Sequence, residues 1–129
     1  VRPDEMLTEI RFPTLPDGHG WSFEEVAPVE GGYPIVGVAA TLETDGETCQ
    51  RPRLAYTAVS DRPIRVPEAE TEVEGQPAAT DTFEAAAEIA SEAVDPPSDV
   101  HGSSDYRRRL VKRLTRDALE QSAERAEGY

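Results

Sequence analysis

Residues 33–59, YPIVGVAATLETDGETCQRPRLAYTAV, decide the fold that the sequence predicts. Residues 33–42 and 49–59 are two extended stretches with many Val, Ile, Ala and Thr residues, and the turn-forming triplet TDG (44–46) stands between them. This arrangement predicts an antiparallel β-hairpin. The first arm carries little side-chain bulk around Gly37, so we expect a helix to pack closely against it there.

Two further stretches before the hairpin favour β-structure. Residues 6–12 (MLTEIRF) carry the apolar side chains of Leu7, Ile10 and Phe12 and stop at a proline. Residues 21–26 (WSFEEV) alternate imperfectly between apolar and polar side chains, as a strand with one solvated face does. We therefore predict a strand in each stretch, and an antiparallel sheet of three to four strands.

The second half of the chain has the 3.6-residue periodicity of helices. A short helix is predicted over residues 68–74, with Pro67 at its first position. A second helix is predicted over residues 81–94, where Asp81 and Glu84 resemble a capping box. Its apolar face consists of Phe83, Ala86, Ala87, Ala90 and Val94.

The last helix has the strongest pattern. Ser103 or Ser104 can cap it, and Asp105 lies in its first turn, where the helix dipole favours an anion. Its apolar stripe consists of Tyr106, Leu110, Leu114 and Ala118, widened by Val111 and Leu119. Strands followed by helices predict an α+β fold, in which about three helices pack on an antiparallel sheet within a single domain over residues 1–129.

The charge balance excludes one class of function. The 129 residues include 26 Asp and Glu against 13 Lys and Arg, and the net charge is −13. A protein that grips nucleic acid needs a cationic footprint, so we do not expect nucleic acid as a partner. Strong acidity and the choice of Arg over Lys suggest a halophilic source as a hypothesis, although a GC-rich genome also replaces Lys by Arg.

The cysteine content and the lack of a visible leader favour the cytoplasm. Cys49 is the one cysteine, so no disulfide can form within the chain, and a cytoplasmic location is expected. No apolar run approaches about 18 residues, which predicts no membrane span. No charged-then-apolar leader is visible, and the chain begins at Val1 and not at Met. We expect it to be a piece of a longer protein.

The residues that usually carry chemistry do not form a convincing site. His19, Cys49 and His101 lie far apart in the sequence, so no metal ligand set is predicted. Residues 98–103 (SDVHGS) contain Ser, His and Asp, but their crowding in one loop before a helix is better explained by turn formation and capping. We therefore predict no catalytic and no metal-binding residue.

One asymmetry of charge leaves two interpretations open. Six of the 13 basic residues lie within ten positions: Arg107, Arg108, Arg109, Lys112, Arg113 and Arg116. They could pair with acids elsewhere on this acidic chain. Alternatively, they could dock onto another domain, a partner subunit or an anionic cofactor, because Arg suits planar, partly desolvated pairing.

Four segments resemble one family. They are RPDEMLTEIRFP (2–13), VGVAATLE (36–43), DRPIRVPEAE (61–70) and DPPSDVHGSSDYRRRLVKRLTRDALE (95–120). The chain resembles the C-terminal domain of the FAD-binding medium subunit of aerobic carbon monoxide dehydrogenases and related xanthine dehydrogenase-family molybdenum hydroxylases. The resemblance implies a three- or four-stranded antiparallel sheet packed by three helices, placed after a two-part FAD-binding region.

The resemblance also implies a role in an oxidoreductase. The domain would cover the flavin and dock partner domains or subunits, while the medium subunit passes electrons between iron–sulfur clusters of a small subunit and an external acceptor. A large subunit carries the molybdenum cofactor. The motifs that hold FAD lie upstream and are absent from this chain, so we expect FAD in the complete subunit, little or no FAD on this chain alone, and no catalysis by it.

Three residues correspond to the family's flavin surroundings. Leu7 matches an apolar position that can cover the isoalloxazine ring, and Tyr33 matches an aromatic position that can lie against it. Glu25, beside Glu24, stands where the family often has a Lys, and an acid there would oppose the charge of the anionic reduced flavin. Tyr33 could equally be an aromatic at a strand edge that packs on the core.

Two further expectations concern the last helix and the domain on its own. Within the family resemblance, Tyr106 is expected to anchor the last helix to the sheet, and the arginine face to serve docking. The alternative function is a free-standing, non-catalytic interaction or scaffold module that keeps the fold without flavin. A domain separated from its neighbours could also form a homodimer through its uncovered surface.

Overall fold

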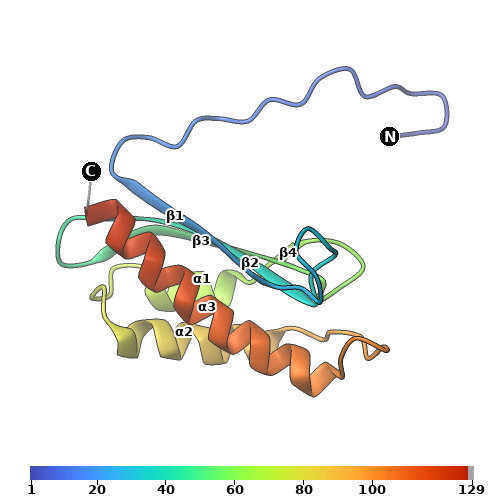
Figure 1. The fold of residues 1–129 in the computed structure, drawn as a ribbon. Coiled ribbons are helices and arrows are strands. Elements are labelled where there is room, and N and C mark those ends of the chain that lie inside the picture. Colours follow the sequence, from blue (N-terminus) through green and yellow to red (C-terminus); the bar gives the residue numbers. More distant parts are fainter. Residues whose placement is uncertain (128–129) are drawn as a thin grey trace.

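A computed structural model describes residues 1–127 of the chain. Its sheet consists of β1 (His19–Val26), β2 (Val36–Thr44), β3 (Cys49–Thr57) and β4 (Ile64–Arg65), in that spatial order and with antiparallel neighbours. The helices are α1 (Pro67–Val73), α2 (Thr80–Ala93) and α3 (Ser104–Glu127). All three lie on one face of the sheet (Figure 1). The predicted α+β fold, an antiparallel sheet of three to four strands packed by about three helices, is confirmed.

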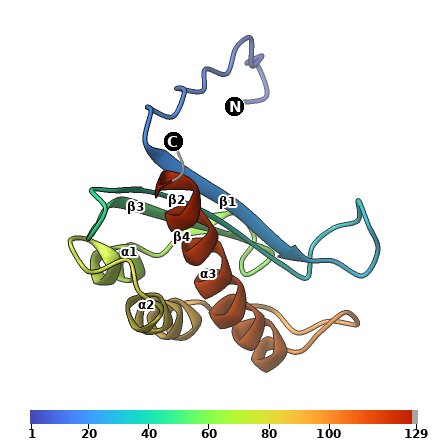
Figure 2. The ribbon, with the colours of Figure 1, turned by 60° about the vertical axis from the view of Figure 1, so that its left-hand side comes forward.

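The core lies between the sheet and the helix layer. β2 turns Val36, Val38, Ala40 and Leu42 toward the helices, and all four side chains are buried. α3 runs obliquely beneath the sheet, with α1 and α2 beside it (Figure 2). Every member of the two predicted apolar stripes except Tyr106 is buried, and all of them but Val94, which directly follows α2, lie within the two helices: Phe83, Ala86, Ala87, Ala90, Val94, Leu110, Val111, Leu114, Ala118 and Leu119.

α3 rests directly on the backbone of β1 at Gly20. A Cβ atom added to Gly20 would lie 1.6 Å from the Ser122 carbonyl oxygen and 2.7 Å from the Ala126 nitrogen. At Gly37, by contrast, an added Cβ would meet the side chains of Thr57 and Phe23 on the neighbouring strands. The predicted close approach of a helix is therefore wrong for Gly37, because that residue faces away from the helices.

The predicted strand over residues 6–12 is wrong. The segment is extended but lies apart from the sheet, on the side opposite to the helices, and pairs with no strand among residues 1–127 (Figure 1). Hydrogen bonds to a neighbouring strand are what define a strand, and β-compatible composition supplies none of them. Its large apolar side chains, including those of Leu7, Ile10 and Phe12, are exposed. The fourth strand is instead β4, which has two residues, too few to produce a recognisable pattern in the sequence.

The helix ends agree with the sequence pattern except at α2. α1 begins at Pro67, and Ser103 accepts the Tyr106 N–H at 3.2 Å, as a capping serine of α3 does. α2 begins at Thr80, one residue before the predicted cap, and no side chain caps it. The predicted capping box at Asp81 is therefore wrong. Its carboxylate lies inside the first turn, where it interacts favourably with the positive end of the helix dipole.

A buried carboxylate joins α1 to β3 and β4. Glu70 accepts the Leu54 N–H at 2.9 Å and the Arg65 Nε–H at 2.8 Å, and Arg65 makes a second contact through its other nitrogen. Burial by itself raises the pKa of the Glu70 carboxyl. The bonds from Arg65 and Leu54 together lower this pKa by more than burial raises it, so the net pKa lies below the ordinary value. The ionised carboxylate therefore stabilises the contact between β3, β4 and α1.

Glu70→Gln should lower the free energy of unfolding at neutral pH by about 2 kcal/mol, because it breaks a charge-assisted pair at a buried site. A folded-state pKa below the ordinary value gives stability that is present above the ordinary pKa and is lost as the pH falls through the lowered one. Urea denaturation at several pH values should show the difference from wild type shrinking toward acid. The exposed neighbour Glu72→Gln is the control, and an equal loss in both variants would contradict the assignment.

Gly20→Ala should lower the free energy of unfolding by about 3 kcal/mol, because the added methyl group meets the backbone of α3 and not a flexible side chain. Ser22→Ala changes the same face of β1 without adding atoms, and it removes one hydrogen bond to Glu24. It should cost under about 1 kcal/mol. Thermal or urea denaturation measures both, and a Gly20→Ala protein as stable as Ser22→Ala would refute the close contact.

Candidate functional site

Three loops meet at the end of the sheet where β1 ends and β2 begins. Residues 27–35 connect β1 to β2, residues 58–63 follow β3, and residues 94–103 lead into α3. They surround an open pocket of about 510 Å³. Its lining residues are Pro28, Val29, Gly32, Tyr33, Pro34 and Ile35 from the first loop, Ala58 and Ser60 from the second, Pro97, Asp99 and His101 from the third, and Arg107 of α3.

Two of the three predicted flavin-contacting residues lie at this end of the sheet. Tyr33 is 96% exposed on the first loop, so it does not pack on the core. Glu25 is the register partner of Gly37, and its side chain is exposed near the end of β1. Leu7 lies in the extended N-terminal segment, and no described contact joins it to the pocket. The structure therefore groups Tyr33 and Glu25 and leaves Leu7 apart.

Arg107 holds the three loops together. Its side chain is only 5% exposed and makes an ion pair with Asp99 at 2.7 Å. One terminal nitrogen donates to the main-chain carbonyls of Ile35 and Ala58, the latter at 3.1 Å. In the sequence Arg107 looks like one member of a surface run, and reasoning from the pattern missed this role. Its spacing is the available signal, because Arg107 precedes the buried Leu110 and Val111 by three and four residues.

The loop of residues 98–103 is built for turn formation. Asp99 accepts the His101 N–H at 2.8 Å and the Gly102 N–H at 3.2 Å through one oxygen, while its other oxygen binds Arg107. The His101 N–H bond, followed by the Arg107 bond, lowers the pKa of the Asp99 carboxyl. Ser98 accepts the Ser104 N–H at 2.8 Å. These bonds agree with the interpretation of this stretch as turn and cap.

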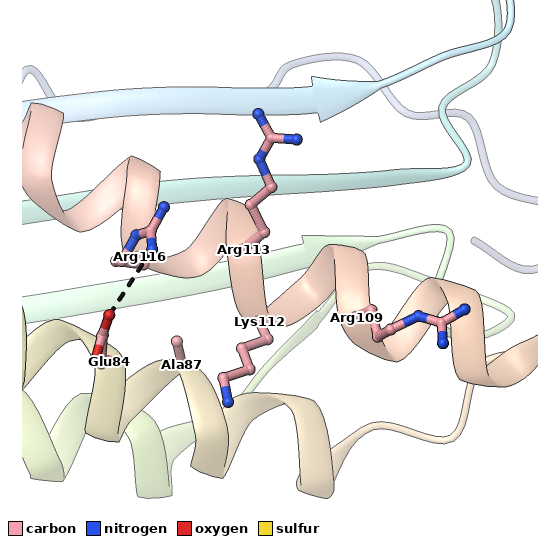
Figure 3. Close-up of a pocket in the computed structure, with 6 residues that line it drawn as sticks. All are labelled: Glu84, Ala87, Arg109, Lys112, Arg113 and Arg116. Carbon is pink, nitrogen blue, oxygen red and sulfur yellow. Dashed lines mark ion pairs between the residues drawn. The ribbon is translucent and has the colours of Figure 1, made fainter.

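The basic run pairs mostly within the chain. A pocket of about 290 Å³ between α2 and α3 is lined by Glu84, Ala87 and four cations of α3. Figure 3 shows Arg116 turned toward Glu84, while Arg109 extends away from that pair. Among residues 1–127, five of the six basic residues have an ion pair, and Arg109 has none: the pairs are Arg107–Asp99, Arg108–Asp95, Lys112–Glu88, Arg113–Asp117, Arg116–Asp117 and Arg116–Glu84.

Tyr106 does not anchor α3 to the sheet as expected. It is 36% exposed and lies over Gly102, where an added Cβ would meet the Tyr106 ring at 2.9 Å. The first turn of α3 is tied to the rest of the fold through Arg107 instead. The two residues differ in the side of the helix they occupy: Arg107 is buried and reaches the carbonyls at the sheet end, while the Tyr106 ring stays on the loop.

The face of the sheet opposite to the helices is partly apolar. Trp21 and Phe23 are each about half exposed there, and the Arg125 guanidinium lies 4.7 Å from the centre of the Trp21 ring.

Within the described part of the chain, no helix is long and apolar enough to cross a membrane, and no three His, Cys, Asp or Glu side chains gather so as to hold a metal ion.

Comparisons with known proteins agree with one another. Residues 21–122 match the family described as CO dehydrogenase flavoprotein C-terminal domain. The chain is 36% identical to the glyceraldehyde dehydrogenase medium chain of Sulfolobus acidocaldarius over 92% of its length, and 29% identical to the carbon monoxide dehydrogenase medium chain of Afipia carboxidovorans over 98%. A solved structure of reconstituted CO dehydrogenase from Oligotropha carboxidovorans covers 88% of this chain with a TM-score of 0.83 and 26% identity.

The match is to part of each relative. The chain spans 42% of the glyceraldehyde dehydrogenase medium chain, 44% of the carbon monoxide dehydrogenase medium chain and 40% of the matched chain in the solved structure. The alignments with the two medium chains extend over more of this chain than the 102 residues from 21 to 122. Most of residues 1–20 therefore have counterparts in these relatives, although they lie outside the matched domain.

Proposed function

The chain belongs to the family of CO dehydrogenase flavoprotein C-terminal domains. We therefore propose that the end of the sheet where the three loops (27–35, 58–63 and 94–103) meet forms one wall of a flavin site in a molybdenum hydroxylase-type oxidoreductase. FAD would be held by FAD-binding domains that precede this domain. The chain itself would supply surface and charge, and no reacting group. This division of labour fits a family whose relatives are medium chains longer than the domain.

The observation that carries the proposal is the exposure of Tyr33. A phenol ring that is 96% exposed, on a loop whose base is fixed by hydrogen bonds, offers a flat apolar surface with no partner among the described residues. Aromatic side chains in such positions gain most when a second planar group covers them. An isoalloxazine ring is such a group, and contact with Tyr33 would exclude water from one of its faces.

Glu25 would set the charge beside that ring. Its exposed carboxylate lies on the open face of the sheet, near the strand end that leads into the Tyr33 loop. A negative charge there disfavours the anionic reduced flavin and would lower its midpoint potential. Leu7, from the N-terminal segment, would reach the ring only when that segment is placed by the preceding domain.

The partners would be the remaining parts of the complex. The exposed apolar side chains of Met6, Leu7, Ile10 and Phe12 offer the preceding FAD-binding domain a contact surface. Arg109 is the cation of the basic run left for docking on a subunit that holds iron–sulfur clusters or the molybdenum cofactor. The other five are engaged by acids of this chain, so the docking role proposed for the whole run narrows to one residue.

The second candidate is a free-standing interaction module that has the fold without flavin. The observation in its favour is Glu25, an acid where the family resemblance leads one to expect a cation. The two candidates differ in one property, which is whether the protein perturbs bound FAD.

Tyr33→Ala, in the FAD-loaded protein that contains this chain, should change the visible absorption band of the flavin, because the ring loses its stacking partner. Tyr33→Phe keeps the ring and should keep the wild-type band. Glu72→Gln, at an exposed residue of α1 outside the three loops, controls for general surface effects. Identical spectra for Tyr33→Ala and wild type would refute the ring contact and favour the interaction module.

Glu25→Lys should raise the midpoint potential of the bound flavin by about 30 mV, since a change of two charges near the ring stabilises the anionic reduced form. Glu47→Lys makes the same charge change at the β2–β3 turn, which lies at the opposite end of the sheet. It should leave the potential within about 5 mV, because screening by salt suppresses distant charges. Equal shifts in both variants would mean that Glu25 does not lie beside the flavin.

A further inference from the structure

Two consecutive arginines bind two different parts of the fold with the same chemistry: Arg107 binds the three loops, and Arg108 binds the C-terminal end of α2. Arg107 donates to the carbonyls of Ile35 and Ala58 and pairs with Asp99. Arg108 donates to the carbonyls of Ser91 and Glu92, at 3.3 and 3.4 Å, and pairs with Asp95 at 3.1 Å. Each residue thus joins two carbonyls and one aspartate, but only Arg107 reaches the loop that carries Tyr33.

Arg107 acts on the Tyr33 loop at its base. Ile35 follows Tyr33 by two residues, and its N–H donates to the Val26 carbonyl at 2.7 Å, which closes the loop against β1. The Ile35 carbonyl then receives the Arg107 guanidinium. Both main-chain groups of Ile35 are therefore fixed, one by the neighbouring strand and one by α3. The direction in which the chain leaves Tyr33 follows from these two bonds.

The second carbonyl belongs to a strained residue. Ala58 has a positive φ of 62°, which an L-residue with a side chain adopts only at a cost. It directly follows β3 and turns the chain toward Ser60. The Arg107 bond to its carbonyl, at 3.1 Å, stabilises this conformation. The same guanidinium therefore fixes the loops on both sides of the pocket beneath Tyr33.

Burial makes Arg107 hard to replace. The residue is 4% exposed, and its Nε is buried without a hydrogen-bond partner among the described residues. A buried guanidinium persists only where most of its donors are satisfied, and here the two terminal nitrogens have three acceptors between them. An apolar replacement would leave both carbonyls without this donor, and a lysine could not span all three acceptors with one ammonium group.

We propose that Arg107 is a positioning residue for the flavin contact: it fixes the loop of residues 27–35 so that Tyr33 is presented to the ring. This inference rests on the proposed function for its consequence at the flavin. The bonds by which Arg107 fixes the loop depend only on contacts within this chain. The experiment therefore has one arm without flavin and one with it.

The first arm measures hydrogen–deuterium exchange of peptides from the protein that contains this chain. Arg107→Met should speed exchange across residues 27–35 about tenfold, and Arg107→Lys about threefold, while peptides from β2 and β3 keep the wild-type rate. Arg108→Met and Arg108→Lys are the matched controls, which should speed exchange only around residues 91–97. If Arg107→Met does not fold, Arg107→Lys decides. Unchanged exchange at 27–35, or equal acceleration by the Arg108 variants, would overturn the proposal.

The second arm follows the flavin absorption band in the FAD-loaded protein. Arg107→Lys should shift the band in the direction of Tyr33→Ala, and it should cause no further shift in a Tyr33→Ala background, because a positioning residue acts through the residue it positions. An equal shift in both backgrounds would overturn the proposal. If Tyr33→Ala itself leaves the band unchanged, the flavin function fails, and the exchange arm still decides whether Arg107 clamps the loop.

Discussion

The absence of a side chain at Gly20 is the constraint on which the rest of the structure depends. It lets the backbone of α3 lie against β1, with the Ser122 carbonyl where a Cβ would otherwise be. Ser122 also donates from its hydroxyl to the Ala40 carbonyl at 3.3 Å, so the same turn of α3 touches two strands. With its C-terminal half fixed in this way, the 24-residue helix carries its first turn to the far end of the sheet. Arg107 reaches the three loops because of that placement.

The sequence predicted the elements that have their own periodicity. α2 and α3 repeat apolar residues every three to four positions, and the β2–β3 hairpin has a turn that Asp45 closes by accepting the Thr48 N–H at 2.7 Å. These are local features, so the pattern alone could reveal them. Residues 6–12 have an equally good strand composition and no strand to pair with among the residues that the structure describes, a circumstance that composition does not encode.

The site was less predictable, because it depends on long-range contacts. The resemblance to a family singled out Tyr33 and Glu25, and the fold places both near one end of the sheet. Arg107 looked like its five basic neighbours, and it differs from them in pointing at carbonyls from residues 35 and 58, far away in the sequence. The close approach of a helix was likewise predicted at Gly37 and occurs at Gly20, because small residues mark an approach without saying from which side it comes.

The N-terminal segment has a consequence for handling the isolated chain. Met6, Ile10 and Phe12 share one side of an extended backbone with Thr8, and Glu9 and Arg11, which pair with each other, share the other side. Such a ribbon, apolar along one side and with unpaired peptide groups, is a template onto which another copy can add. We therefore expect the polypeptide, purified alone, to self-associate through this segment, and removal of its first fifteen residues to reduce that association.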